Sequence, residues 1–129
     1  MISSSVYDYI NVLGKAEDAA WKRNEAIANN IANQDTPGYK RIDVDFESAL
    51  RTALKDSRYQ TMDSKVHNIR ETALEADVYT DHAGFSYRLD GNNVDPATEQ
   101  IELAKNQIRY QGLVDAANAE FSRLTAVTK

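Results

Sequence analysis

The chain contains no cysteine, only two prolines and two histidines, and no long run of apolar residues. Without cysteine it forms neither disulfides nor thiolate metal sites, and a cysteine nucleophile is excluded. Its longest uninterrupted apolar runs span a few residues, whereas a membrane-spanning helix needs about 20. The opening residues, Met1 to Asp8, lack the basic and apolar regions of a signal peptide. We therefore expect any export to use a route without a cleavable signal.

Basic residues are also in the minority. The 129 residues include 15 Lys and Arg against 20 Asp and Glu, which gives a net charge of −5. That balance argues against nucleic acid or an anionic membrane as the main partner. The length suits one domain, and the mean hydropathy of −0.59 predicts a thin core or an elongated shape.

Apolar residues recur at helical spacing from Ser5 to about Asn33, a stretch that contains no proline. Several of them are seven residues apart and share one narrow stripe of a helix. Asp35-Thr36-Pro37-Gly38 then ends the helix, because proline followed by glycine is typical of a type II turn. We expect residues 1–35 to form a long N-terminal helix. Its stripe consists of Val6, Ile10, Leu13, Ala20, Ile27 and Ile31.

The C-terminal part has the matching signals of a helix start. Asp95 is placed to cap a helix whose first residue is Pro96, and Glu99 falls in the first turn. No proline follows before the end of the chain. We expect a second long helix over residues 95–129. Its apolar stripe consists of Tyr110, Leu113, Val114, Ala117, Phe121 and Leu124.

Residues 36–94 form an insert between these helices. Its pattern predicts a short helix behind a capping Asp45, and a possible β-hairpin of residues 77–80 and 85–89. Residues 57–76 show no clean period. The fold class is therefore mainly α, with two long terminal helices forming a coiled-coil-like pair and a small irregular insert. The helices together make one discontinuous domain. Their stripes exceed what the insert covers, so the remainder requires other copies or a partner.

Candidate catalytic residues are scarce. His67 and His82 do not have the spacing of a metal-binding helix. The acidic run Asp43, Asp45 and Glu47 lacks the glycine and further oxygen ligands of a calcium loop, and helix capping explains it more simply. We expect no enzymatic activity, no cofactor and no metal.

The strongest local motif runs from Ile27 to Arg41. A capped helix end followed by a turn accounts for Pro37, Gly38 and one asparagine. It does not account for three asparagines beside two small alanines. Small residues allow another backbone to approach closely, and carboxamides bond to both donors and acceptors. The pattern therefore favours a packed interface of fixed register.

This motif closely resembles the signature of the flagellar basal-body rod and hook proteins. The resemblance continues from Leu89 through Asp95 and from Ala104 to Gln111, and covers residues 1–50 and 88–129. Among these proteins it is closest to a proximal rod subunit. The hook and distal-rod relatives usually carry a Met-rich stretch where this chain has Gln100, Ile101 and Leu103. The signature positions are Ala28, Asn29, Asn30, Ala32, Asn33, Thr36, Pro37, Gly38, Tyr39, Lys40, Asp90, Gly91, Asn92, Asn93, Val94 and Asp95.

The resemblance implies a structural subunit of the rod, the axial shaft that crosses the periplasm. It also implies export in an unfolded state through the flagellar type III apparatus and addition in helical symmetry. The expected partners are copies of the chain, other rod proteins, ring or adaptor components and the export apparatus, without nucleic acid or membrane insertion. Both apolar stripes are the expected assembly interface, and we expect the terminal helices to order fully only on assembly. The alternative is a soluble helical-hairpin adaptor or secretion chaperone.

Overall fold

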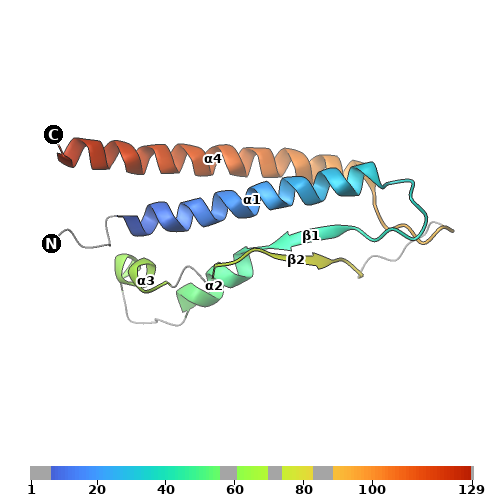
Figure 1. Cartoon of the computed structure of the whole chain (residues 1–129), viewed down its shortest axis with the longest axis horizontal. Coiled ribbons are helices and arrows are strands. Elements are labelled where there is room, and N and C mark those ends of the chain that lie inside the picture. The colour runs from blue at the N-terminus through green and yellow to red at the C-terminus, as the bar shows by residue number, and fades with distance from the viewer. Residues whose placement is uncertain (1–6, 56–60, 70–73, 83–88, 129) are drawn as a thin grey trace.

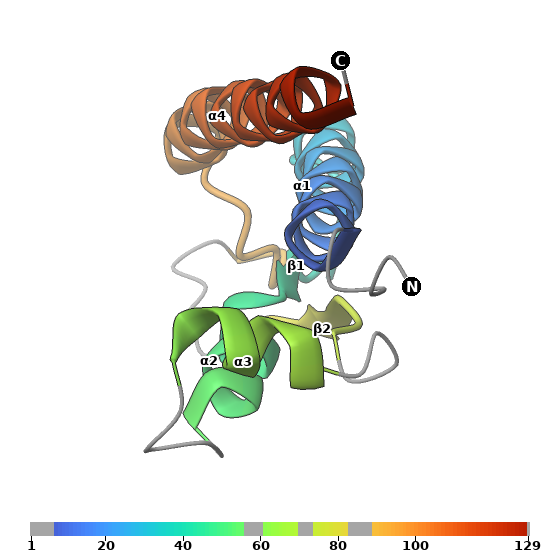
Figure 2. The ribbon, with the colours of Figure 1, turned by 90° about the vertical axis from the view of Figure 1, so that its left-hand side faces the viewer.

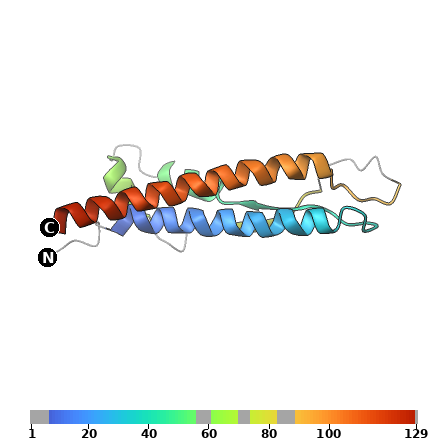
Figure 3. The same cartoon turned by 90° about the horizontal axis from the view of Figure 1, so that it is seen from above.

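The computed structural model describes residues 7–55, 61–69, 74–82 and 89–128. Two long helices, α1 (Asp8–Ala32) and α4 (Pro96–Thr128), run antiparallel beside one another (Figure 1). The start of α1 and the end of α4 lie at the same end of the molecule. Seen from above, the two helices follow each other along their length (Figure 3). The predicted fold class, with two long terminal helices that pack together and a small insert, is confirmed.

The insert forms a third layer on the other side of α1. It consists of β1 (Ile42–Asp45), α2 (Glu47–Lys55), α3 (Met62–Asn68) and β2 (Asp77–Thr80). Figure 2 shows α1 between α4 and these elements. The central helix therefore buries two faces, one against α4 and one against the insert. The insert packs on Val12, Ala16 and Ala19 of α1, which lie outside the predicted apolar stripe.

A small hydrophobic cluster holds the insert on α1. Ala19, Phe46 and Leu74 are each at most 4% exposed. The partly buried residues packed against them come from α1, from α2 and from the chain between α3 and β2, and are Val12, Ala16, Leu50, Ala53, Ile69 and Ala76. Because the cluster draws on segments far apart in the chain, it fixes the position of the insert.

The first residues of α4 and α2 are set by capping side chains next to them in the sequence. Asp95 caps α4 as predicted, since its Oδ1 accepts a hydrogen bond from the N–H of Ala97 at 3.1 Å. Asp45 also acts as predicted at the start of α2, where its Oδ1 accepts from the N–H of Ser48 at 3.1 Å. Hydrogen bonds from the backbone and the side chain of Ser48 hold the pKa of Asp45 below its usual value.

The insert contains one helix that the sequence pattern did not predict. Thr61 caps α3 by accepting a hydrogen bond from the N–H of Ser64 at 3.3 Å. Val66 is the only buried residue in this helix. One buried position gives no period, which is why residues 57–76 lacked a helical pattern.

The predicted hairpin is only partly correct. Residues 77–80 do form strand β2, but its partner is β1, with Ile42 opposite Thr80 and Val44 opposite Val78. The pairing is antiparallel and joins segments about 35 residues apart. Of the second predicted strand, residues 85–88 lie outside the described residues, and Leu89 is in a turn. The acidic run is explained by β1, where Val44 is buried between two aspartates that flank it on the other face.

Candidate assembly site

Helix α1 ends at a C-capping asparagine, Asn33, which is followed by a tight turn. Asn33 donates from its backbone N–H and from Nδ2 to the carbonyl of Asn29, at 3.1 and 2.8 Å. Tyr39 donates its N–H to the carbonyl of Thr36 at 3.2 Å, and Gly38 between them has a φ of 73°. That geometry is the predicted type II turn, in which glycine is favoured at the third position.

The second signature segment folds back onto this turn through Asn92. Asn92 is 1% exposed. Its Nδ2 donates to the carbonyls of Asn33, Gln34 and Thr36 at 2.8, 3.0 and 2.8 Å. Its Oδ1 accepts from the N–H of Val94 at 2.8 Å. One side chain thereby ties the end of α1 to the segment that leads into α4.

Two glycines with positive φ, Gly38 and Gly91, lie where these segments meet. Gly38 donates its N–H to the carbonyl of Asp90 at 2.7 Å, and Lys40 donates through Nζ to the carbonyl of Gly91. Gly91 has a φ of 77°, in the left-handed region that side chains disfavour. A Cβ added at Gly91 would lie 3.8 Å from the Cα of Gly38.

Asn30 provides the deepest polar contact of the joint. It is fully buried and uses all of its strong hydrogen-bonding capacity. Nδ2 donates to the carbonyl of Ile42 at 2.8 Å and to Oε2 of Glu99 at 3.1 Å. Oδ1 accepts from the N–H of Ile42 at 2.9 Å and from the hydroxyl of Tyr39 at 3.1 Å. Asn30 therefore joins α1, β1 and α4.

A buried ion pair completes this joint. Arg41 donates through Nε to Oε1 of Glu99 at 2.8 Å and through Nη1 to Oδ2 of Asp81 at 3.0 Å. Glu99 is fully buried. Burial acts to lower the pKa of Arg41, but the hydrogen bonds to these two carboxylates and the charge of Asp43 raise that pKa above its usual value. The sequence pattern placed Glu99 in a first turn and did not reveal this role, which depends on a contact with residue 41.

A second cation fixes the insert against both long helices. Arg23 is 8% exposed and donates through Nη2 to the carbonyl of Val44 at 2.9 Å and to Oε2 of Glu47 at 2.8 Å. Arg109 of α4 donates to Oε1 of the same glutamate at 3.1 Å. Burial raises the pKa of Glu47, but the bond from Arg23 outweighs it and the net shift is downward.

These contacts change the interpretation of the asparagine motif. Asn30 and Asn33 make their hydrogen bonds inside the chain, so they are not free to bond across an interface between subunits. Asn30 obtains its partners from Tyr39, Ile42 and Glu99, and Asn33 from Asn29 and Thr36. Ala28, Asn29 and Ala32 are exposed on the outer side of α1, where a neighbouring molecule can reach them.

The predicted interface residues divide by exposure. On α1, Ala20 and Ile27 are buried while Ile10, Leu13 and Ile31 are half-buried; Val6 lies outside the described residues. On α4, Leu113, Val114, Ala117 and Leu124 are half-buried, whereas Tyr110 and Phe121 are exposed. The two stripes are thus partly used for packing within the chain.

A further apolar surface of α4 was missed. Ile101 and Ile108 are 56% and 76% exposed on the side opposite the buried Glu99 and Asn106. With Ala104 and Gly112, which are also exposed, they form what we call the outer stripe. The seven-residue spacing of the two isoleucines was visible in the sequence. The assembly interface was assigned to the longer stripe from Tyr110 to Leu124, and the isoleucines were passed over.

A groove of about 270 Å³ lies between α1 and α4. Asn106 in this groove donates through Nδ2 to the carbonyl of Ala20 at 2.8 Å. Its Oδ1 is buried and accepts no hydrogen bond from the described part of the chain. The lining residues are Ala20, Trp21, Asn24, Asn106, Gln107, Tyr110 and Gln111.

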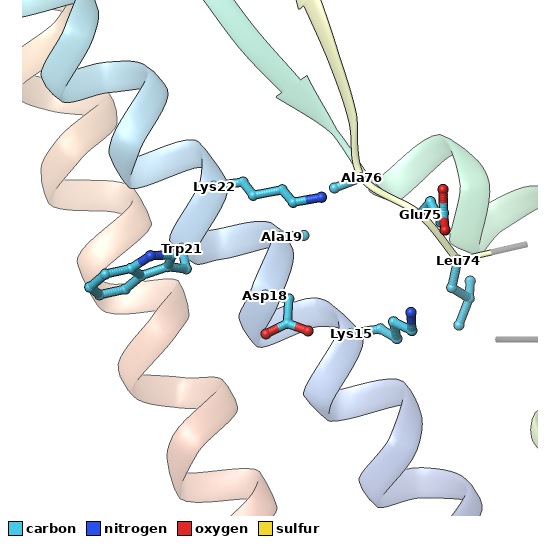
Figure 4. Close-up of a pocket in the computed structure, with 8 residues that line it drawn as sticks. All are labelled: Lys15, Asp18, Ala19, Trp21, Lys22, Leu74, Glu75 and Ala76. Atoms are coloured by element: carbon cyan, nitrogen blue, oxygen red, sulfur yellow. The ribbon is translucent and has the colours of Figure 1, made fainter. Parts of the chain in front are cut away.

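A second hollow, of about 280 Å³, lies between α1 and residues 74–76 (Figure 4). Lys15 and Lys22 extend from α1 toward Leu74 and Ala76, whereas Trp21 points away toward α4. The lining contains neither histidine nor a hydroxyl group, and its charged side chains are Lys15, Asp18, Lys22 and Glu75.

Metal ligands and membrane spans are two other features on which a functional site can depend. Within the described ranges, no group of three His, Asp or Glu residues is placed to hold a metal ion. No helix in those same ranges combines the length and hydropathy of a membrane span. What the described residues offer is a polar joint that sets the two helices, and apolar helix surfaces beside a groove.

Known flagellar proteins are similar in sequence to this chain over most of its length. A family model for "Flagella basal body rod protein" matches residues 10–40, which cover most of α1 and the turn after it. The flagellar basal body rod protein FlgB of Bacillus subtilis is 34% identical over 128 residues, covering 98% of this chain and 95% of the relative. FlgB of Escherichia coli is 33% identical over 113 residues, or 82% of each chain, and FlgB of Salmonella typhimurium 35% over 101 residues, or 70% of each. The chain belongs to the FlgB family of flagellar basal body rod proteins.

Proposed function

We propose that the chain is a structural subunit of the proximal part of the flagellar rod and that it assembles by packing its terminal helices against neighbouring subunits. Its family consists of structural rod proteins and not of enzymes. The observation that carries the mode of assembly is the exposure of α4 on several sides. Ile101, Ile108 and Phe121 are all more than half exposed.

Such a helix is unusual for a free subunit. Its exposed apolar side chains stand among charged and polar ones, and only α1 and the side chains of Arg41 and Glu47 contact α4 among the interactions described above. Burying one large apolar side chain contributes about 1.5–3 kcal/mol. Contacts between unlike surfaces of successive copies do not close into a ring and so produce a helical filament. Packing of the exposed face of α4 in this way would drive growth of a rod.

Folding and assembly are coupled in this proposal. The first half of α4 is anchored by Glu99 and Asn106, the only buried residues in the helix. From residue 113 onward no described side chain of α4 is fully buried. We expect this second half to open readily in the isolated chain and to become fixed when neighbours pack on it. Amide exchange of residues 113–128 reports this step.

The finer partners and the location are also part of the proposal. Ring or adaptor components at the base of the rod and the flagellar export apparatus are the expected contacts beyond other rod proteins. The expected place is the periplasmic section of the rod, reached without a cleavable signal. The helical-hairpin adaptor is disfavoured because the chain belongs to a family of rod proteins. In sedimentation an adaptor gives one sharp species, whereas a rod subunit remains monomeric or forms larger open assemblies.

Deletion of the gene in its bacterium tests the function. We expect loss of swimming, and basal bodies that retain their membrane rings but lack rod and hook in electron micrographs. Expression of the intact gene should restore both. Normal swimming with complete basal bodies, in a strain without a second copy of the gene, would contradict the proposal.

A further inference from the structure

We propose that the groove between α1 and α4 receives the outer stripe of α4 from a second copy of the chain. This contact rests on the proposed rod function, because it names the partner surface for the assembly. Two independent features of the structure point to it, one in the groove and one on the stripe.

The groove contains an acceptor without a donor. Asn106 is 3% exposed, its Nδ2 is bonded to the carbonyl of Ala20, and its Oδ1 accepts nothing from the described residues. A buried polar atom left without a hydrogen bond costs about 1–3 kcal/mol. Trp21 and Tyr110 stand beside it, 64% and 37% exposed. An exposed aromatic pair next to an unsatisfied amide is the chemistry of a surface that another molecule completes.

The outer stripe contains a glycine that the chain itself does not need. A Cβ placed on Gly112 would meet nothing within 4 Å. Glycine in the interior of a helix is about 1 kcal/mol less favourable than alanine, so the position is costly without a contact to explain it. A glycine on an exposed helix face allows a second helix to approach closely. The stripe it ends, from Ile101 through Ala104 and Ile108, is apolar and exposed.

The two surfaces are complementary. None of the side chains that line the groove carries a charge at neutral pH, and the four residues of the outer stripe are uncharged as well. Gln100, Gln107 and Gln111 follow one edge of the stripe, and the last two also line the groove beside it. Their amide N–H groups are donors of the kind that Oδ1 of Asn106 lacks. The charged neighbours Glu102 and Lys105 bond to each other at 3.0 Å.

The contact joins the groove of one copy to the outer stripe of another. A row of such copies therefore has an empty groove at one end and a free outer stripe at the other. That arrangement continues indefinitely, as a rod requires. A symmetric contact of groove with groove would stop at two copies and would leave every outer stripe exposed.

Trp21 provides a direct readout, because it is the only tryptophan in the chain. The intact chain at low concentration is titrated with the Trp21→Phe chain, which lacks tryptophan emission but keeps the stripe. Docking should shift the Trp21 emission to shorter wavelength and protect it from acrylamide quenching. The matched titrants add Gly112→Leu or Gly14→Leu to Trp21→Phe. Both glycines are in helices and a Cβ at either would meet nothing within 4 Å, so we expect both changes to preserve the fold, which circular dichroism of each titrant checks.

We expect the Trp21→Phe and Gly14→Leu titrants to bind alike and the Gly112→Leu titrant to bind at least about tenfold more weakly. Equal binding by the two leucine variants would overturn the stripe as the occupant. Absence of any shift up to about 1 mM titrant would overturn a second copy as the occupant. Neither result depends on the rod itself, because rods in the complemented deletion strain are scored separately by microscopy.

Discussion

Replacing Glu99 by leucine is expected to lower the free energy of unfolding by about 3 kcal/mol, the largest loss of any single change in the joint. The carboxylate is fully buried and accepts hydrogen bonds from Arg41 and Asn30. Its removal leaves the guanidinium of Arg41 with the charges of Asp81 and Asp43 only, which places the cost at the lower end for a broken buried ion pair. Urea denaturation followed by circular dichroism measures the change.

The control lies one turn away on the same helix. Glu102→Leu removes a carboxylate that is paired with Lys105 near the surface, and exposed pairs contribute at most about 1 kcal/mol. We therefore expect a clear difference in stability between the two variants. If both lowered stability by the same small amount, the joint around Glu99 would not be what holds the helices in place.

Replacing Ile108 by glutamate is expected to abolish swimming while leaving the isolated chain folded. The side chain is 76% exposed, and substitutions at such positions change stability by about 0.5 kcal/mol or less. In the assembled rod the same carboxylate would be removed from water without a partner, which costs several kcal/mol. Swimming on soft agar and electron microscopy of basal bodies measure assembly, and thermal denaturation of the purified chain measures folding.

Two companion variants make the result specific. Ile108→Val keeps an apolar side chain and should retain swimming. Thr52→Glu adds the same charge at an exposed position of α2, away from the surfaces assigned to assembly, and should also retain swimming. Full motility of the Ile108→Glu strain would show that the outer stripe stays in water in the rod.

The long helices were predictable because their signals are local. The spacing of the apolar residues and the cap at Asp95 act over a few residues, so they survive in any fold that contains them. The turn at Pro37 and Gly38 was predictable for the same reason. These local signals were enough to predict the fold class and the approximate bounds of α1 and α4.

The joint between the helices was not predictable in the same way. Asn30 and Asn92 bond to segments roughly 10 to 70 residues away. The residues next to them in the sequence do not indicate which segments these are. The pattern correctly favoured a packed interface, and for Asn30 that interface lies within the chain. A buried carboxamide and an interface carboxamide have the same local sequence.

The pairing of β2 with β1 was not predicted, for a related reason. Residues 77–80 have the composition of a strand, and the nearest candidate partner in sequence was residues 85–89. The structure pairs them with residues 42–45, where the aspartates on either side of Val44 suggested only a helix cap, and residues 85–88 lie outside the described part of the chain. Register across an insert depends on tertiary packing, and here Phe46 and Leu74 set it by packing on α1.

Amide exchange of the second half of α4 tests the central claim most directly, namely that surfaces left open in the free chain become buried in the rod. Residues 113–128 would be followed by mass spectrometry in the dilute chain and in purified basal bodies. We predict fast exchange in the dilute chain and exchange slowed by at least about 100-fold in the rod, equivalent to about 2.7 kcal/mol of protection. Slow exchange in the dilute chain, independent of its concentration, or equally fast exchange in the rod would contradict the account.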